Sequence, residues 1–508
     1  MERSRSCNIS TLRRNTTNTK NRGIVLLKRI NLLYITLGVI ITVWLWWCTS
    51  SILSNKNASS VTKKTMPMEV RDLLKLAQIS VDGDDAKTTT WPDITKLDLS
   101  NQGLSELPPD LPTALPNLSV LFLSNNKFTE LPAIIGQCPN LQMIAFKSNQ
   151  MTSIHPDALH SQLRWLILTD NLLLELPDSL GGNCRRLQKL MLSGNRLTAI
   201  PKSISNCRNL ELVRLASNRL TEPPMELLSL PSLRWVALSD NPFLEEIMTL
   251  PKLPTLEVLH DLDESEEGTI LGQGAGGVTK KLTYQSEPVA IKIFSNSMTS
   301  DGLPAMERRI LSVVSGLNSS GFVALLGQSK SGYSVTEFLD NYRAFGGPPS
   351  MESCSRDVYE SEQKLSLEHA TNLITVLLEA LYQLHSMGIT HGDFYGHNIL
   401  VSHDLNNVKL SDFGAAFFYD TNTAYGTLIE KIELRAFGVL VSEVLLQLDT
   451  PTKDEDEAVS VEAYKKRLQQ LVDLCYQEES TFESVSIWLK QRALSDMANA
   501  FDVTDEKD

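Results

Sequence analysis

Leucines and polar residues follow a fixed order over much of the first half of the chain. The pattern L-x-x-L-x-L-x-x-N-x-L-x-x-L-P reads cleanly from Leu163 to Pro177. It starts again, at intervals of 22 to 24 residues, from Leu118, Leu141, Leu187, Leu210 and Leu233, and in a weaker form from Ile94. One such unit cannot bury its leucines alone, so neighbouring units must stack on each other. The pattern therefore predicts seven short strands with one shared core.

An asparagine stands at one fixed place in these units, where its amide would bond to backbone across turns. The column comprises Asn126, Asn149, Asn171, Asn195, Asn218 and Asn241. Cys138, Cys184 and Cys207 also share a register, three residues before a leucine that starts a unit, which indicates packing. Over residues 91–256 the chain resembles the leucine-rich repeat family, whose α/β solenoid has this period.

The strand positions that carry no repeat leucine should face the concave side of such a solenoid. This face includes Val120, Phe122, Met143, Trp165, Ile167, Met191, Leu212, Arg214 and Trp235. An apolar, aromatic stripe outside the solenoid core favours a protein partner or substrate, with Phe122, Trp165, Ile167, Arg214 and Trp235 as contacts. The alternative is that a neighbouring domain covers it.

The start of the chain has a different pattern. Residues 1–31 are basic and are expected to be disordered, and an uncharged run of 22 residues follows from Leu32 to Leu53. About 20 apolar residues span a bilayer as a helix, so residues 32–53 predict a transmembrane anchor or, alternatively, a cleaved presequence. Residues 54–90 read as a linker that ends in a possible capping helix.

Two arguments disagree about the side of the membrane on which the rest of the chain lies. Basic residues before the span slightly outnumber those after it, which would place the rest of the chain in a lumen. The need for ATP, the odd count of seven cysteines and the lack of a disulfide pattern favour the cytosolic side. The net charge of −13 argues against nucleic-acid binding.

The second half carries ordered polar motifs between apolar runs. "ILGQGAGGV" holds Gly272, Gly274 and Gly277, and glycines let backbone amides approach phosphates. A β-branched run ends in Lys292, and an amphipathic helix then carries Glu307 as a natural ion-pair partner. "HGDFYGHNIL" at residues 391–400 and "DFG" at 412–414 follow in order.

This ordered set makes residues 259–508 resemble a protein kinase domain, an α+β fold with two lobes. The resemblance implies ATP and Mg²⁺ as cofactors. It makes Asp393 the catalytic base and Lys292, paired with Glu307, the residue that holds the ATP phosphates. Asn398 and Asp412 would bind the metal. The nucleotide would contact Gly272, Gly274, Gly277, Ala290, Lys292, Glu337 and Leu339, with Thr336 at the back of the adenine pocket.

The chain departs from the family pattern at several places. Gly392 replaces the Arg that precedes the catalytic Asp and normally receives a phosphorylated activation loop. Tyr395 replaces the Lys that neutralises the γ-phosphate, and no A-P-E motif follows D-F-G. Glu433 stands where an Asp usually anchors the catalytic loop from a buried helix.

Three functions therefore compete. The first is an active, compact protein kinase, with serine or threonine as the default acceptor, joined to a recruiting repeat array. The second is a pseudokinase scaffold in which the repeats do the binding. The third is a small-molecule phosphotransferase, because H-G-D-(x)4-N-I-L also resembles the aminoglycoside and choline kinase loop. The intact D-F-G and the complete set of ATP and Mg²⁺ residues favour the first.

Overall fold

A computed structural model describes most of the chain beyond its N-terminal segment. The described residues are 68–78, 90–244, 256–274, 277–294, 298–317, 319–360, 364–449 and 455–502. Met68–Asp508 form one compact unit, which holds both the repeats and the second domain. The anchor predicted at 32–53 lies outside the described residues. Within the described part, no helix is long and apolar enough to span a membrane.

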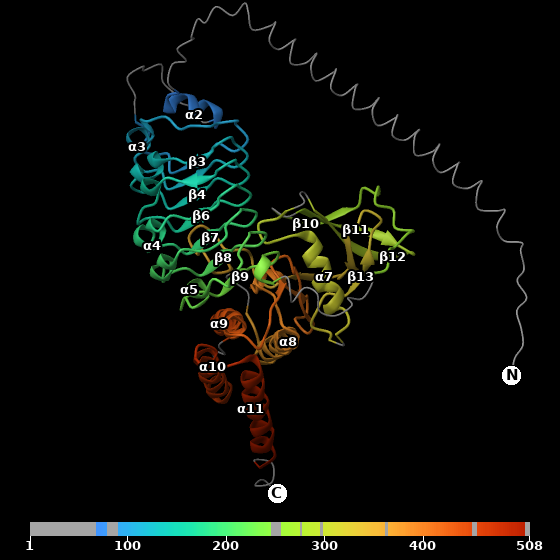
Figure 1. Cartoon of the computed structure of the whole chain (residues 1–508). Coiled ribbons are helices and arrows are strands. Elements are labelled where there is room, and N and C mark those ends of the chain that lie inside the picture. The colour runs from blue at the N-terminus through green and yellow to red at the C-terminus, as the bar shows by residue number, and fades with distance from the viewer. Residues whose placement is uncertain are drawn as a thin grey trace, which may run out of the picture. The chain divides into compact units, whose positions relative to one another are not determined.

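The repeats form one parallel seven-stranded sheet in chain order (Figure 1). Its strands are β1 (Lys96–Asp98), β2 (Val120–Phe122), β4 (Met143–Ala145), β6 (Trp165–Ile167), β7 (Lys189–Met191), β8 (Leu212–Arg214) and β9 (Trp235–Ala237). The other side of the units carries α3 (Leu111–Ala114), η1 (Ala133–Gln137), η2 (Pro156–Ala158), α4 (Ser179–Asn183), η3 (Lys202–Asn206) and α5 (Met225–Leu228), and η4 (Pro242–Leu244) follows the last strand. β3 (Glu130–Leu131) pairs with β5 (Ser153–Ile154). The predicted seven-unit solenoid is confirmed.

The asparagine column forms the expected ladder. The Asn171 Nδ2 donates to the carbonyls of Phe146 and Leu168 at 2.9 and 3.0 Å, and its Oδ1 accepts from the Met151 N–H at 3.0 Å. Asn126, Asn149, Asn195, Asn218 and Asn241 make the same kind of bonds. Each amide thus bonds buried backbone groups of two neighbouring units, and carbonyls such as that of Phe146 accept from two successive asparagines.

The core of the solenoid is closed at its N-terminal end by a helix. α2 (Val70–Leu76) buries Val70, Leu73 and Leu74 in the same cluster as the repeat leucines, and it lies within the range where the sequence suggested a capping helix. The three cysteines of the repeat register are buried there too, as predicted from their spacing. Burial raises the pKa of the Cys138 and Cys207 thiols to about 11, so they are packing residues.

The second domain begins with a five-stranded sheet of order β10-β11-β12-β14-β13. The strands are β10 (Thr269–Gly274), β11 (Gly277–Tyr284), β12 (Glu287–Phe294), β13 (Leu325–Gln328) and β14 (Ser334–Glu337), and α7 (Pro304–Val314) is their helix. Leu259 and Leu262 pack under this sheet with Val289 and Val335, so the domain already includes the residues just after the repeats.

The rest of the second domain is mainly helical. It contains α8 (Leu367–Ser386), α9 (Ala424–Gln447), α10 (Glu455–Cys475) and α11 (Phe482–Asp502). Its short strands are β15 (Tyr342–Ala344), β16 (Ile389–Thr390), β17 (Ile399–Ser402), β18 (Val408–Leu410) and β19 (Phe417–Phe418), with η5 (Gly396–Asn398) before β17. β15, β17 and β18 form one sheet, and β16 pairs with β19. The two-lobed α+β architecture agrees with the prediction.

The concave face of the solenoid is covered where a free partner surface was predicted. Trp235 is 1% exposed and Arg214 is 2% exposed, and both contact the second domain. Trp165 Nε1 lies against the Cys354 sulfur. The prediction of a free binding face at these three residues is wrong, because the chain's own second domain occupies that part of it. Phe122 on β2, nearer the N-terminal end, and Ile167, on the same strand as Trp165, stay half-buried.

The asparagine ladder yields a stability prediction. Asn171→Ala removes four hydrogen bonds, and it leaves the buried Met151 N–H without a partner. We expect a loss of about 2–4 kcal/mol in the free energy of unfolding, measured by urea denaturation. The exposed Asn209, whose Nδ2 bonds only the Arg185 carbonyl, is the control, and Asn209→Ala should cost less than about 1 kcal/mol. Equal losses in both variants would contradict the ladder.

Candidate active site

A cleft of about 530 Å³ lies between the five-stranded sheet and the short strands that follow it. Its lining includes most of the residues assigned to the nucleotide and the metal: Gly272, Ala290, Lys292, Glu307, Thr336, Glu337, Leu339, Asn398 and Asp412. Gly274 and Gly277 pair with each other where β10 turns into β11. Residues separated by 140 positions in the chain thus meet in one cavity.

Lys292 is the ionic centre of the cleft. Its Nζ lies 2.8 Å from Glu307 Oε1 and 2.8 Å from Asp412 Oδ1. Burial opposes the charge on Lys292, but Asp412 and Glu307 outweigh it and raise the pKa of this ammonium. Burial likewise raises the pKa of the Glu307 carboxyl, and the nearby Lys292 opposes that shift only in part. For Asp412 the attraction of Lys292 prevails over burial and lowers the pKa, so its carboxylate is ionised.

The loop at residues 391–398 corresponds to the catalytic loop of the kinase family pattern and is called so below. A buried carboxylate on α9 holds it in place. Glu433 accepts the backbone N–H of Gly392 at 2.6 Å and that of His391 at 2.9 Å. Its Oε2 also lies 2.7 Å from His385 Nε2. The anchoring role predicted for Glu433 agrees with this geometry, and the extra methylene relative to Asp is accommodated.

Asp393 and Asn398 lie together at the end of this loop. The Asn398 Nδ2 donates to the Asp393 carbonyl at 2.8 Å and to Asp393 Oδ2 at 3.0 Å. The Asn398 amide oxygen is therefore the atom available to a cation, and Asp412 adds a carboxylate in the same cleft. Two oxygen donors of this kind suit Mg²⁺, which prefers few protein carboxylates and amide oxygens together with substrate phosphates.

His397 lines the same cleft and was not singled out from the sequence. Its Nδ1 lies 2.7 Å from Asp357 Oδ1, and its backbone N–H donates to Asp357 Oδ2 at 3.1 Å. Burial lowers the pKa of the imidazole, but the hydrogen bond and charge of Asp357 outweigh it and raise the pKa overall. Asp357 lies far upstream of the loop in sequence, so no local motif could have indicated this pair.

Arg214 is the second residue that sequence reasoning did not place at the site. It stands on β8 of the solenoid, yet its Nε lies 2.8 Å from Asp301 Oδ1 and its Nη1 donates to the Gly392 carbonyl at 3.0 Å. Its Nη2 forms an ion pair with Asp393. The sequence placed Arg214 on the concave face but contained no signal for which domain it would meet.

The two unusual positions of the catalytic loop also contact the solenoid. Tyr395 stacks on Trp235 with ring centroids 4.1 Å apart and planes at 9°. Gly392 has a φ of +73°, and a Cβ there would lie 2.5 Å from the Val236 carbonyl oxygen and 2.7 Å from that of Ala415. The Trp235 Nε1 donates to the Phe394 carbonyl at 2.8 Å. Both positions at which the loop departs from the family pattern thus lie against the docked repeats.

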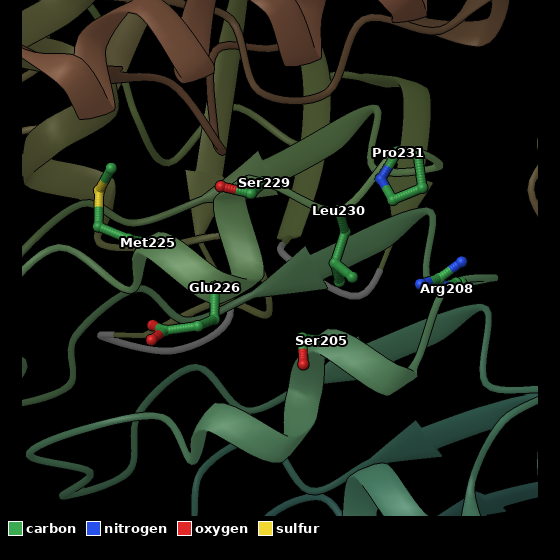
Figure 2. A pocket seen from close by; sticks show the side chains of 7 residues that line it. All are labelled: Ser205, Arg208, Met225, Glu226, Ser229, Leu230 and Pro231. Atoms are coloured by element: carbon green, nitrogen blue, oxygen red, sulfur yellow. The ribbon is translucent and has the colours of Figure 1, made fainter.

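A separate hollow of about 550 Å³ lies between η3 and α5, on the helical side of the last repeats (Figure 2). Its lining is Ser205, Arg208, Met225, Glu226, Ser229, Leu230 and Pro231. None of the phosphate- or metal-binding candidates belongs to it, so it is not the site of phosphate chemistry.

Comparison with known families agrees with both halves of the chain. The protein kinase domain model matches residues 265–444, and the leucine rich repeat model matches 92–151, 161–220 and 185–243. The chain therefore combines leucine-rich repeats with a protein kinase domain, as the spacing of its motifs predicted.

Several known proteins share parts of this arrangement. The chain is 32% identical over 158 residues to Ras guanine nucleotide exchange factor V of Dictyostelium discoideum, which covers 26% of this chain and 8% of that protein. It is 38% identical over 117 residues to the leucine-rich repeat serine/threonine-protein kinase 1 of Mus musculus, a match that covers 21% of this chain and 6% of that protein. A probable serine/threonine-protein kinase of Encephalitozoon cuniculi is 28% identical over 157 residues, a match that covers 30% of this chain and 27% of that protein. The chain thus spans less than a tenth of the first two relatives.

The contact at Gly392 yields a second prediction. Gly392→Arg restores the family residue, but its Cβ would strike the Val236 carbonyl, and the positive φ adds about 1–3 kcal/mol of strain. We expect a melting temperature lower by several degrees in calorimetry. Gly182→Arg, on an exposed helix where a Cβ meets nothing within 4 Å, is the matched control. An unchanged melting temperature for Gly392→Arg would show that the repeats do not pack on the loop in this way.

Proposed function

We propose that this protein transfers the γ-phosphate of ATP to protein hydroxyls, with serine or threonine as the acceptor. The observation that carries the proposal is the single cleft in which Lys292 bridges Glu307 and Asp412 while Asn398 faces the same cavity. The names of two relatives, which are serine/threonine kinases, support the acceptor class.

In this proposal, the residues of the cleft have different roles that follow from their chemistry. Lys292, held by Glu307, is suited to bind the α- and β-phosphates, and the glycines of the β10–β11 hairpin offer backbone N–H groups above them. Ala290, Thr336, Glu337 and Leu339 surround the space that suits an adenine ring. Mg²⁺, when bound by Asn398 and Asp412, would neutralise charge on the phosphates.

Asp393 is the candidate acceptor for the proton of the substrate hydroxyl. Its side chain is 20% exposed, so a hydroxyl group can reach it. Because phosphoryl transfer involves little covalent chemistry by the protein, catalysis depends mainly on positioning and on charge neutralisation. The Glu433 anchor supplies the positioning, since it fixes the backbone just before Asp393.

The pseudokinase scaffold remains a second candidate because the solenoid contacts the catalytic loop through Trp235 and Arg214. In that case the wild-type chain would bind nucleotide without transferring phosphate. The small-molecule phosphotransferase receives no specific support from the described residues.

Partner recruitment, if the repeats perform it, falls to the uncovered N-terminal part of the concave face. Phe122 is half-buried there, with the Lys96 ammonium 5.4 Å from its ring centroid. Trp235 and Arg214 are already occupied by the kinase domain. We therefore place partner contacts at the N-terminal repeats and not at these two residues.

The catalytic assignment leads to a third prediction. Lys292→Met removes the phosphate-binding ammonium and Asp412→Asn removes the metal carboxylate, so each should lower phosphate transfer from labelled ATP to casein to background. Asp393→Asn should reduce kcat at least about 100-fold and leave the affinity for ATP nearly unchanged. Lys330→Met, on an exposed loop, is the control. Undiminished transfer by Asp412→Asn would exclude this chemistry.

We also propose that residues 32–53 anchor the protein in a membrane, with the kinase on the cytosolic side. The support is the uncharged run and the cleft's need for ATP. The opposite orientation would expose sequons at Asn57, Asn117 and Asn318 to glycosylation.

The fourth prediction tests this orientation. Asn117 is exposed, and its Nδ2 donates to the Pro92 carbonyl at 2.9 Å. When the full chain is produced in eukaryotic cells and treated with a glycosidase, we expect no mass shift that depends on Asn57, Asn117 or Asn318, since the sequons at Asn8 and Asn15 lie on the other side of the anchor. A shift that disappears in Asn117→Gln would place the repeats and the kinase in a lumen. Recovery of the chain in the soluble fraction without detergent would argue against the anchor itself.

A further inference from the structure

Two residues of the catalytic loop lack the side chains that the kinase family pattern has there, and the solenoid stands at both. At Gly392 the Val236 carbonyl leaves no room for a Cβ, and at Tyr395 the ring lies flat on Trp235. The loop therefore has neither the Arg before Asp393 nor the Lys after it. The positive charge that these residues would bring has to come from elsewhere or be absent.

Arg214 brings a guanidinium to this place from the repeats. Its contacts are the Gly392 carbonyl, the Asp393 carboxylate and Asp301 Oδ1. At 2% exposure it is sealed from solvent, and its two carboxylate partners raise its pKa despite the burial. A guanidinium is the group suited to such a site, because its planar fork binds several acceptors at once and keeps its charge.

The charges around Arg214 explain why a cation is needed there. Burial raises the pKa of Asp301, Arg214 opposes this shift, and the nearby Asp393 and Asp412 carboxylates add to it. Lys292 is already engaged by Glu307 and Asp412. Without Arg214 the remaining carboxylates would repel each other, and Asp393 would lose a partner that fixes one of its oxygens.

Arg214 also connects the two parts of the kinase domain. Asp301 lies in the loop before α7, the helix that carries Glu307, while Gly392 and Asp393 belong to the catalytic loop. The Thr299 hydroxyl accepts the N–H groups of Asp301 and Gly302 and donates to the Gly302 carbonyl, which makes that loop compact. One side chain thus ties the element that positions Lys292 to the aspartate proposed to act as base.

We propose that Arg214 is a positioning residue of the kinase site and that the solenoid completes this site. The proposal rests on the function proposed above. From another domain, Arg214 brings a positive charge to the loop in which Gly392 and Tyr395 stand in place of the family's Arg and Lys. The repeats are then a structural part of the catalytic unit as well as a surface for partners.

The geometry of the cleft indicates that the docked solenoid completes the site and does not block it. With the solenoid docked, the Lys292–Glu307 pair is formed at 2.8 Å and the cleft stays open next to Asn398 and Asp412. An ionised carboxylate offers about four lone-pair positions. Arg214 and Asn398 each take one at Asp393, and its side chain keeps 20% exposure. A substrate hydroxyl therefore still has an acceptor.

The test compares Arg214→Ala, Arg214→Lys and the control Arg219→Ala in the full chain. Arg219 is an exposed arginine five residues further along the same repeat. Steady-state transfer to casein gives kcat and the KM for ATP, binding of a fluorescent ATP analogue gives nucleotide affinity, and calorimetry reports folding. We expect Arg214→Ala to lose at least about 100-fold in kcat with little change in the KM for ATP. Arg214→Lys should recover part of this, and Arg219→Ala should match wild type.

Chemical rescue separates positioning from a purely structural role. Guanidinium ion, added well below denaturing concentration, should restore part of the kcat of Arg214→Ala and none of that of Asp393→Asn. If Arg214→Ala does not fold, Arg214→Lys decides: a lowered kcat at unchanged ATP affinity supports the role, and a wild-type kcat overturns it.

The remaining outcomes separate this role from the proposed function. If Arg214→Ala has a higher kcat than wild type, the docked solenoid inhibits the kinase. The role assigned to Arg214 is then wrong, while the proposed kinase activity is supported. If the kcat of Arg214→Ala equals that of wild type, the contact is inert and the assignment fails likewise. A wild-type chain that binds ATP with Mg²⁺ and transfers no phosphate overturns the proposed function itself.

Discussion

A buried guanidinium joins the repeats to the kinase domain, and the arrangement of the catalytic loop depends on it. Taking Arg214 out of water costs several kcal/mol, which only close partners can offset. Asp301, Asp393 and the Gly392 carbonyl provide them. Since removing one member of a buried ion pair leaves an uncompensated charge, the docked position of the solenoid and the position of the Asp393 side chain are coupled. Trp235 on the next strand reinforces this contact through Tyr395 and the Phe394 carbonyl.

The regularity of the solenoid makes this contact possible. The asparagine ladder and the leucine core hold β8 and β9 in register, so that Leu212 stands beside Trp235 and Arg214 beside Ala237. A rigid sheet of this kind can present a charged and an aromatic side chain together to a loop on another domain. Further contacts extend the same surface: Glu211 pairs with Arg356 at 2.7 Å, and Arg435 of α9 donates to the Leu230 carbonyl at 3.1 Å. The two domains therefore share a substantial interface within one compact unit.

Much of the site was accessible from sequence because kinase chemistry leaves local signatures. Lys292, Glu307, Asn398 and Asp412 each lie in a short motif whose spacing predicts its place, and the structure brings them into one cleft. Glu433 was expected to anchor the loop from its position on a buried helix, and it does so through two backbone N–H groups. His397 was missed, since its pairing with Asp357 joins residues 40 positions apart that share no motif. The predicted free face at Trp165, Arg214 and Trp235 was wrong for a related reason, because nothing local shows which surface will cover an apolar stripe.

The sequence by itself determined the elements whose energetics are periodic or local. The repeat period, the asparagine column and the buried cysteines follow from rules that act over fewer than 30 residues, and each kinase motif is itself a short local pattern. Tertiary structure alone decided how the two domains meet, because that depends on shape and charge matching between residues far apart in the chain, such as Leu230 and Arg435, which are 205 positions apart. The missing side chains at Gly392 and Tyr395 appeared in sequence as departures from a family pattern. Their physical reason, a carbonyl and an indole of the solenoid in the same space, exists only once the chain is folded.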